Sequence, residues 1–592
     1  MTATAPSETL GGPGAATGRV PADRVDDAYD AVARVNRAEV WIGLRERDEV
    51  RAEAEVAEGP LAGLLLAVKN NVDVAGLPTT AACPTFATGP AEADAVAVAR
   101  LRSAGATVIG TTNLDQFATG LVGQRSPYGG VRDARRPAYV SGGSSSGSAV
   151  AVALGLADLA IGTDTAGSGR VPAAYQGIVG IKPTLGVVST EGVVPACRSW
   201  DAVTIMARDL ATAGAAMGVM AGGPGTRAWP ADAPVGAPAR PRLAVPDELV
   251  AMAPGWAEAF GAAVDQARTA GCAIVPIPFG SFLEAARLLY DGGLVAERHA
   301  AVGDFVDTHR EDVDPTVGAI IARAGDVRAS DMLRDRERLD ALKRESLALL
   351  TDCDALLVPT APGQPTRADV AADPVGVNSW VGTYTNFCNL FDLCAVAVPA
   401  GEVADQGDGV AQFGVTLLAP AFGDAVVADV AARVRGLGSE GPSDRGTPGD
   451  GAVVPPLPWP AAAGLATTEL FVVGAHLVGQ PLERELRDRG ALWCGPARTA
   501  AAYALKALDT TPPKPGLVRV GAGGAAIRGE VWRLSVGALG DFLAALPSPM
   551  NLGAVDLEDG REVLGFGCDA QSAAGGADIT RHGGWKAYLA AR

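Results

Sequence analysis

Histidine is scarce in this sequence, with four residues among 592 and none before His299. The usual general base of a serine nucleophile is therefore missing from the first half of the chain. Basic residues are also outnumbered, with 49 Lys and Arg against 67 Asp and Glu and a net charge of -18. This balance argues against nucleic acid or an anionic membrane surface as a partner, because phosphate binding needs a positive field.

Long apolar runs and paired cysteines are absent as well. The longest apolar stretch, residues 149–161, is interrupted by Asp158 and is too short to span a bilayer. The eight cysteines show no CxxC spacing, which predicts buried thiols in a reducing compartment. We find no metal cluster, nucleotide loop or haem motif and expect neither metal nor cofactor. The first twenty residues lack the apolar segment of a secretory signal, so we expect a cytoplasmic protein.

The remaining sequence alternates strand and helix patterns. An apolar run over 61–68 predicts a buried strand that ends at Lys69, and residues 26–47 carry helical periodicity. This alternation indicates an α/β fold, a sheet covered by helices on both faces. Glycine, serine and proline dominate 436–466, which is typical of a linker. We predict a flexible N-terminus (1–25), a large domain (26–435), the linker and a small C-terminal α+β domain (467–592).

Two glycine-framed serines stand out, Ser144 in SGGSSSGS and Ser168 in GTDTAGSGR, 24 residues apart. Lys69 precedes Ser144 by 75 residues within the apolar run LLLAVK. A serine nucleophile needs a neighbour to take its proton, and burial is the way to make a lysine neutral enough for that task. A lysine-based relay is therefore the economical interpretation, and it indicates a serine hydrolase that cleaves amides.

Two other interpretations of these segments exist. Residues 143–147 satisfy G-x-S-x-G, the nucleophile elbow of α/β-hydrolases, with Ser145 as nucleophile and a histidine downstream. That interpretation leaves Lys69 and the whole loop over 163–170 without a role. Plain Gly-Ser loops with a strand-end lysine are the second alternative, and we favour catalysis because all three elements occur together.

These motifs resemble, in order and spacing, the amidase signature family over roughly residues 25–435. The resemblance implies a large mixed sheet and a homodimer. It also implies that Ser168 is the nucleophile, that Ser144 passes its proton to Lys69, and that Gly143–Ser144 is a cis peptide. The small-residue turn before the nucleophile can direct backbone N–H groups at the oxyanion, with the candidate donors Thr165, Ala166, Gly167 and Ser168. Asp164 and Arg170 are predicted to buttress this loop.

Within that family the chain looks most like the allophanate hydrolases, in the segments 112–128, 163–174, 192–199 and 382–390. The implied reaction is hydrolysis of allophanate to ammonia and carbon dioxide in urea degradation, downstream of a biotin-dependent urea carboxylase. Tyr290 and Arg298 match the family's carboxylate-binding pair in type and spacing, and Gly292-Gly293 break the helix between them. The alternative is a surface pair of Arg298 with Glu297 and a core tyrosine.

The C-terminal segment resembles the extra domain of allophanate hydrolases, itself similar to γ-glutamylcyclotransferase-like folds, through FVVGAHL (471–477) and GEVW (529–532). The resemblance makes His476 the candidate base for breakdown of the first product, and a purely structural or oligomerising domain is equally open. Three alternatives remain for the whole chain: an amidase for another small amide, a subunit that releases ammonia from glutamine for transamidation, and a non-catalytic binding protein on an amidase scaffold.

Overall fold

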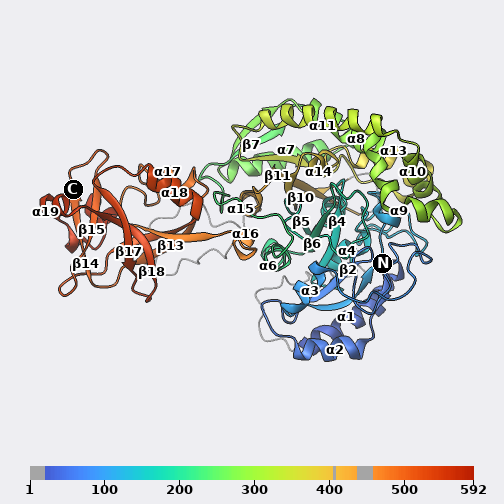
Figure 1. Ribbon diagram of the computed structural model, residues 1–592, viewed down its shortest axis with the longest axis horizontal. Coiled ribbons are helices and arrows are strands. Elements are labelled where there is room, and N and C mark those ends of the chain that lie inside the picture. The colour runs from blue at the N-terminus through green and yellow to red at the C-terminus, as the bar shows by residue number, and fades with distance from the viewer. Residues whose placement is uncertain (1–20, 405–408, 436–457) are drawn as a thin grey trace, which may run out of the picture.

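The computed structural model describes residues 21–404, 409–435 and 458–592 (Figure 1). Of the predicted flexible N-terminus and linker, residues 1–20 and 436–457 lie outside the described residues. The described parts include the first residues of α1 (Pro21–Val35) and the short helix α16 (Trp459–Ala462). Proline suits the first turn of a helix because its missing N–H would have no partner there.

The helix predicted over 26–47 is wrong beyond residue 35. Helix α1 (Pro21–Val35) ends where Asn36 takes a φ of 46°, and the chain continues as η1 (Ala38–Val40), β1 (Trp41–Leu44) and α2 (Arg47–Val56). Strand β1 pairs antiparallel with β3 (Thr107–Thr112) at the edge of the sheet, burying Trp41. Pairing with a distant strand thus overrides the local helical period.

One mixed sheet of eleven strands organises the large domain. Parallel pairs join β2 to β3 and β4, and β7 to β8 and β9, while the central pairs are antiparallel. In spatial order the strands are β1, β3, β2 (Leu65–Lys69), β4 (Leu159–Asp164), β6 (Ala202–Ala207), β5 (Val179–Lys182), β10 (Leu393–Val403), β11 (Ala411–Pro420), β9 (Ala355–Pro359), β7 (Arg242–Pro246) and β8 (Ala273–Ile277). The expected large mixed sheet is confirmed.

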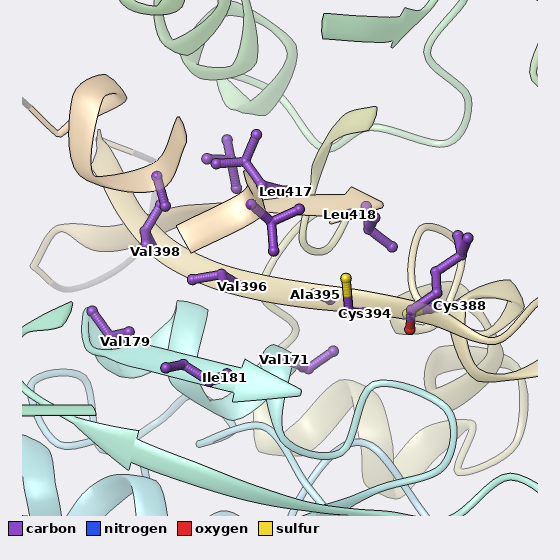
Figure 2. Packing of buried hydrophobic residues seen from close by; sticks show 14 of the residues in the cluster. Val171, Val179, Ile181, Cys388, Cys394, Ala395, Val396, Val398, Leu417 and Leu418 are labelled. Carbon is purple, nitrogen blue, oxygen red and sulfur yellow. The ribbon is translucent and has the colours of Figure 1, made fainter. Parts of the chain in front are cut away.

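Side chains of this sheet are buried on both faces, as alternation along β2 shows. Leu66 and Val68 belong to the main apolar cluster, whereas Leu65 and Ala67 belong to a second cluster with residues of α1 and α4. Figure 2 shows part of the main cluster, where apolar side chains of β5, β10 and β11 gather. The helices of this domain that follow α1 and α2 are α3 (Val96–Ser103), α4 (Ser146–Ala153), α5 (Arg170–Gln176), α6 (Leu210–Met220), α7 (Trp256–Thr269), α8 (Gly280–Asp291), α9 (Ala296–Thr308), α10 (Pro315–Gly325), α11 (Ala329–Leu349), α12 (Arg367–Ala372), α13 (Gly376–Val381), α14 (Phe387–Leu390) and α15 (Asp424–Val434).

The C-terminal domain lies at one end of the molecule and has its own apolar core (Figure 1). A five-stranded sheet contains β13 (Leu492–Arg498), β16 (Arg528–Ser535), β12 (Thr467–Val472), β18 (Glu562–Cys568) and β17 (Met550–Asp556). A three-stranded sheet contains β15 (Lys514–Arg519), β14 (Tyr503–Leu508) and β19 (Ala577–Asp578), and the helices are α17 (Glu483–Arg487), α18 (Val536–Ala544), α19 (Ala570–Gly575) and α20 (Trp585–Ala590). Backbone bonds from Val235 N to Gly490 O and from Gly537 N to Ala231 O join the two domains.

Six of the eight cysteines are buried, Cys353 and Cys568 are half-buried, and all eight are free thiols. In the part of the chain that the structure describes, no helix has the length and apolar character needed to cross a bilayer. The same residues contain no group of three or more His, Cys, Asp or Glu side chains arranged to hold a metal ion.

Candidate active site

Lys69 stands at the end of β2, and Thr163 stands near the end of the neighbouring parallel strand β4. Because parallel strands bring their carboxyl ends to one edge of a sheet, the two side chains meet there. The Lys69 Nζ donates to Ser144 Oγ and to Thr163 Oγ1, both at 2.7 Å. Ser144 reaches this point because it lies in the loop that leads into α4.

Burial governs the protonation of Lys69. The side chain is fully buried, and desolvation lowers the pKa of Lys69 from 10.5 to about 7, even though the nearby Asp115, Asp201 and Asp164 favour the ammonium form. A substantial fraction of this amine is therefore neutral near pH 7 and able to accept a proton.

The peptide between Gly143 and Ser144 is cis, as the family resemblance implied. A Cβ at position 143 would lie 2.2 Å from Asp115 Oδ2 and 2.5 Å from the Gly123 nitrogen, so only glycine fits. The Asp115 carboxylate accepts hydrogen bonds from the backbone N–H of Gly123 and Arg125. It thereby shapes the loop that faces Ser144.

The Ser168 hydroxyl donates to the Gly120 carbonyl at 3.3 Å, and Ser168 is almost fully buried. No hydrogen bond joins the side chains of Ser144 and Ser168 among the described residues, although the Ser145 N–H donates to Ser168 O at 3.3 Å. The Ser145 hydroxyl instead donates to Thr163 O at 3.1 Å and accepts from the Thr163 N–H. Ser145 is thus engaged by strand backbone, which argues against the nucleophile-elbow interpretation.

Asp164 holds the loop that carries Ser168. Its carboxylate accepts from the backbone N–H of Gly167 (2.9 Å) and Gly169 (3.0 Å) and forms a fully buried ion pair with Arg170, 2.9 Å from Nη2 to Oδ1. Burial would raise the pKa of Asp164, but Arg170 holds it below its ordinary value. Asp164 and Arg170 therefore buttress the loop, as predicted.

The predicted set of oxyanion donors needs one change, because the Gly167 N–H is already given to Asp164. The N–H groups of Thr165, Ala166 and Ser168 have no acceptor within the described ranges. Gly167 serves the loop through its conformation, with a φ of +123° and a position where a Cβ would lie 2.4 Å from the Thr385 hydroxyl.

Tyr290 and Arg298 come together at the break between α8 and α9. The Arg298 Nη2 donates to the Tyr290 hydroxyl at 3.1 Å, and Nη1 donates to Thr119 Oγ1 at 3.0 Å. Arg298 is fully buried, its Nε lacks a partner among the described residues, and it forms no direct ion pair with them, although the Asp201 carboxylate stabilises its charge from a distance. Glu297 instead accepts from the Ser199 N–H, so the alternative Arg298–Glu297 pair does not form.

A buried guanidinium without an ion-pair partner is costly unless a ligand supplies one. Its planar fork suits a carboxylate. The pair of Tyr290 and Arg298 therefore has the chemistry of an anion clamp.

Three polar residues around the site had no role in the sequence analysis. Thr163 contacts the Lys69 amine, Thr119 contacts Arg298, and Asp201 accepts from the Thr165 hydroxyl and from the N–H groups of residues 196 and 197. Thr163 could have been found as the side chain just before a strand end. The other two become visible only when distant loops are packed together.

His476 lies far along the chain in the C-terminal domain. Its Nε2 is 2.9 Å from Glu485 Oε2, and its ring stacks on Phe566 at 4.9 Å between centroids. Burial lowers the pKa of His476 below its ordinary value, although Glu485 acts in the opposite direction. The ring is therefore mainly neutral at pH 7, as a general base must be.

Residues 21–427 match the Amidase family, and residues 468–590 match the allophanate hydrolase C-terminal domain. The chain belongs to the amidase family. The predicted resemblance to amidases with this C-terminal domain is confirmed.

Some relatives match nearly the whole chain. Urea amidolyase of Lachancea kluyveri is 42% identical over 561 residues, covering 91% of this chain and 30% of the relative, and that of Saccharomyces cerevisiae is 40% identical with 31% of its length covered. The chain thus spans about a third of these relatives. The solved structure of Kluyveromyces lactis allophanate hydrolase superposes with a TM-score of 0.84 at 38% identity, with 97% of each chain covered.

Proposed function

We propose that this chain hydrolyses allophanate through an acyl-enzyme on Ser168, with Ser144 and Lys69 as the proton relay. The observation that carries the proposal is the pairing of two buried groups in one domain: an amine with a pKa of about 7, and a guanidinium that forms no ion pair with any described residue. The first supplies a base, and the second selects an anionic substrate. The similarity to proteins named allophanate hydrolase and urea amidolyase supports the same substrate.

The acylation step follows from the relay. Lys69 accepts the Ser144 proton while Ser144 takes the proton of Ser168, and the Ser168 oxygen attacks the terminal amide carbon. The free N–H groups of Thr165, Ala166 and Ser168 stabilise the developing oxyanion, each such donor being worth about 3 kcal/mol. Lys69 then returns the proton to the departing nitrogen, which leaves as ammonia.

Deacylation uses the same groups with water as the nucleophile. The relay takes a proton from water, and the water oxygen attacks the acyl carbon. The relay then returns the proton to the Ser168 oxygen as its bond to that carbon breaks, which releases N-carboxycarbamate. Because the relay needs a Ser144–Ser168 contact, we expect the Ser168 hydroxyl to turn from the Gly120 carbonyl toward Ser144 when substrate binds. Catalytic hydrogen bonds commonly tighten in the substrate complex.

The test is ammonia release from allophanate, malonamate, acetamide and glutamine. We expect rapid release from the two short acid amides, and an Arg298→Ala variant that loses mainly affinity for them. Arg344→Ala, at an exposed arginine of α11, is the matched control. Preference for acetamide or glutamine would assign the chain to one of the alternative amidases, and release from no amide would favour a binding protein.

We further propose that the C-terminal domain speeds breakdown of N-carboxycarbamate, with His476 as base. The neutral ring beside Glu485 supports this role. A His476→Ala variant should release ammonia at the normal rate but carbon dioxide more slowly. Equal rates for both products would make His476 structural.

Association is also part of the proposal: a cytoplasmic homodimer that receives allophanate from a biotin-dependent urea carboxylase. The urea amidolyase relatives, about three times longer than this chain, support a link to the carboxylase. Light scattering of the purified protein tests the dimer. Ammonia release from urea in a coupled assay with added carboxylase tests the link.

A further inference from the structure

We propose that Thr119 is the positioning residue that sets the distance between the carboxylate clamp and the nucleophile, and thereby restricts the substrate to short acid amides. This inference rests on the proposed function. The Thr119 hydroxyl accepts a hydrogen bond from Arg298 Nη1 at 3.0 Å. The next residue, Gly120, receives the Ser168 hydroxyl on its carbonyl at 3.3 Å. Neighbouring residues of one short segment therefore contact both ends of the site.

The backbone before Thr119 is unusual. Phe117 and Ala118 take positive φ angles of 51° and 52°, a conformation that non-glycine residues rarely adopt. Such strained residues persist only where the surrounding structure imposes them, and they cluster at functional sites. At Gly120, a Cβ would lie 2.6 Å from Asp115 Oδ2, so the chain is also confined after the turn.

Further contacts fix this turn against α9, the helix that carries Arg298. The Arg125 guanidinium, itself buried, donates to the Thr119 carbonyl at 2.8 Å. The Phe117 ring contacts Phe305 edge-on at 6.0 Å, and Phe305 lies on α9, the helix of Arg298. Thr119 is therefore held by Arg125 through its carbonyl and by Arg298 through its hydroxyl, and the Phe117–Phe305 contact packs the turn against α9.

A fixed spacing discriminates substrates by length. Allophanate and malonamate have a single atom between the carboxylate carbon and the amide carbon, whereas succinamate has two and glutamine has three. Each added carbon lengthens the chain by a bond of about 1.5 Å, which is large compared with the tolerance of an oriented reaction. With Arg298 held by Thr119, the longer amides place their carbonyl carbon beyond the Ser168 oxygen.

The experiment compares Thr119→Val with Thr119→Ser on malonamate, succinamate and acetamide. Valine removes the acceptor of Arg298 and should lower kcat/KM for malonamate about 10-fold to 100-fold, mostly through KM, as is typical of a lost hydrogen bond to a charged group. The decrease in kcat/KM for neutral acetamide should be several-fold smaller. The ratio of kcat/KM for malonamate to that for succinamate should also fall. Serine keeps the hydroxyl and should restore both the rate and the preference.

A double-mutant cycle with Arg298→Ala separates positioning from a general structural effect. Thr119→Val should cost little on malonamate when Arg298 is already absent, because the two side chains act through one contact. Thr308→Val, at an exposed threonine that ends α9, is the matched control and should behave as wild type. Thermal unfolding of each variant is measured in parallel, and Thr119→Ala takes the place of valine if that variant does not fold.

Equal losses on malonamate and acetamide, or full additivity with Arg298→Ala, would overturn the inference about Thr119. If wild type itself hydrolyses acetamide better than allophanate and malonamate, the proposed function fails first and the inference with it. The wild-type substrate ranking therefore distinguishes the two failures.

Discussion

The pH dependence of acylation follows directly from the burial of Lys69. With a pKa of about 7, the lysine is deprotonated as pH rises through neutrality, so the rate should rise with pH and level off above about 8. The neutral fraction is about 9% at pH 6 and about 91% at pH 8, a tenfold difference. At the ordinary pKa of 10.5, only about 0.03% would be neutral at pH 7. Burial therefore increases the available base about a thousandfold.

The assay is pre-steady-state ammonia release from malonamate between pH 5.5 and 9.5. Substrate is kept well below KM, so that the rate reports the free enzyme, and one inflection near pH 7 is expected. Lys69→Arg keeps a cation but cannot give up its proton near neutral pH, so it should lose the inflection together with nearly all activity. A profile that keeps rising to pH 9.5, or one that is flat across the range, would refute a lysine base made neutral by burial. The matched control is the Arg344→Ala variant, which should reproduce the wild-type profile.

Three further predictions concern stability and the nucleophile loop. The folded-state pKa of Lys69 lies below the unfolded value of 10.5, so the unfolded chain binds more protons between about pH 7 and 10.5, and wild-type stability rises with pH over that range. Lys69→Met should therefore be more stable than wild type at pH 6, by at most about 5 kcal/mol. The difference in Tm between the two proteins should shrink toward pH 10. Gly167→Ala should lower kcat about 100-fold or more, because the added Cβ would lie 2.4 Å from the Thr385 hydroxyl. Gly214→Ala is the control: its Cβ would enter open space on α6, so this variant should keep the wild-type kcat and raise the free energy of unfolding by about 0.5–1 kcal/mol. Arg170→Met leaves the Asp164 carboxylate buried and unpaired and should cost about 3–5 kcal/mol in urea unfolding, a loss below 1 kcal/mol being incompatible with the buttress.

The strands that carry the site were predictable because their signals are local. An unbroken apolar run ends at Lys69, and β2 indeed ends there. The helix over 26–47 failed because β1 gains its stability from pairing with β3, about seventy residues away, which no local period reports. The helical residues 21–25 and 459–462 were not predicted, because composition is averaged over segments longer than one helical turn.

The sequence by itself determined the chemistry available to this protein: a lysine in an apolar strand, two glycine-framed serines, and an arginine after a glycine break. These depend on residue type and on local backbone freedom, which the linear order records. Only the tertiary structure decided how the groups meet. It gives the Gly167 N–H to Asp164, brings Thr163 to within 2.7 Å of the Lys69 amine, and sets Thr119 against Arg298, which lies 179 residues away. Such contacts depend on the burial and register of distant segments, because hydrogen bonds and desolvation act over a few ångströms whatever the separation along the chain.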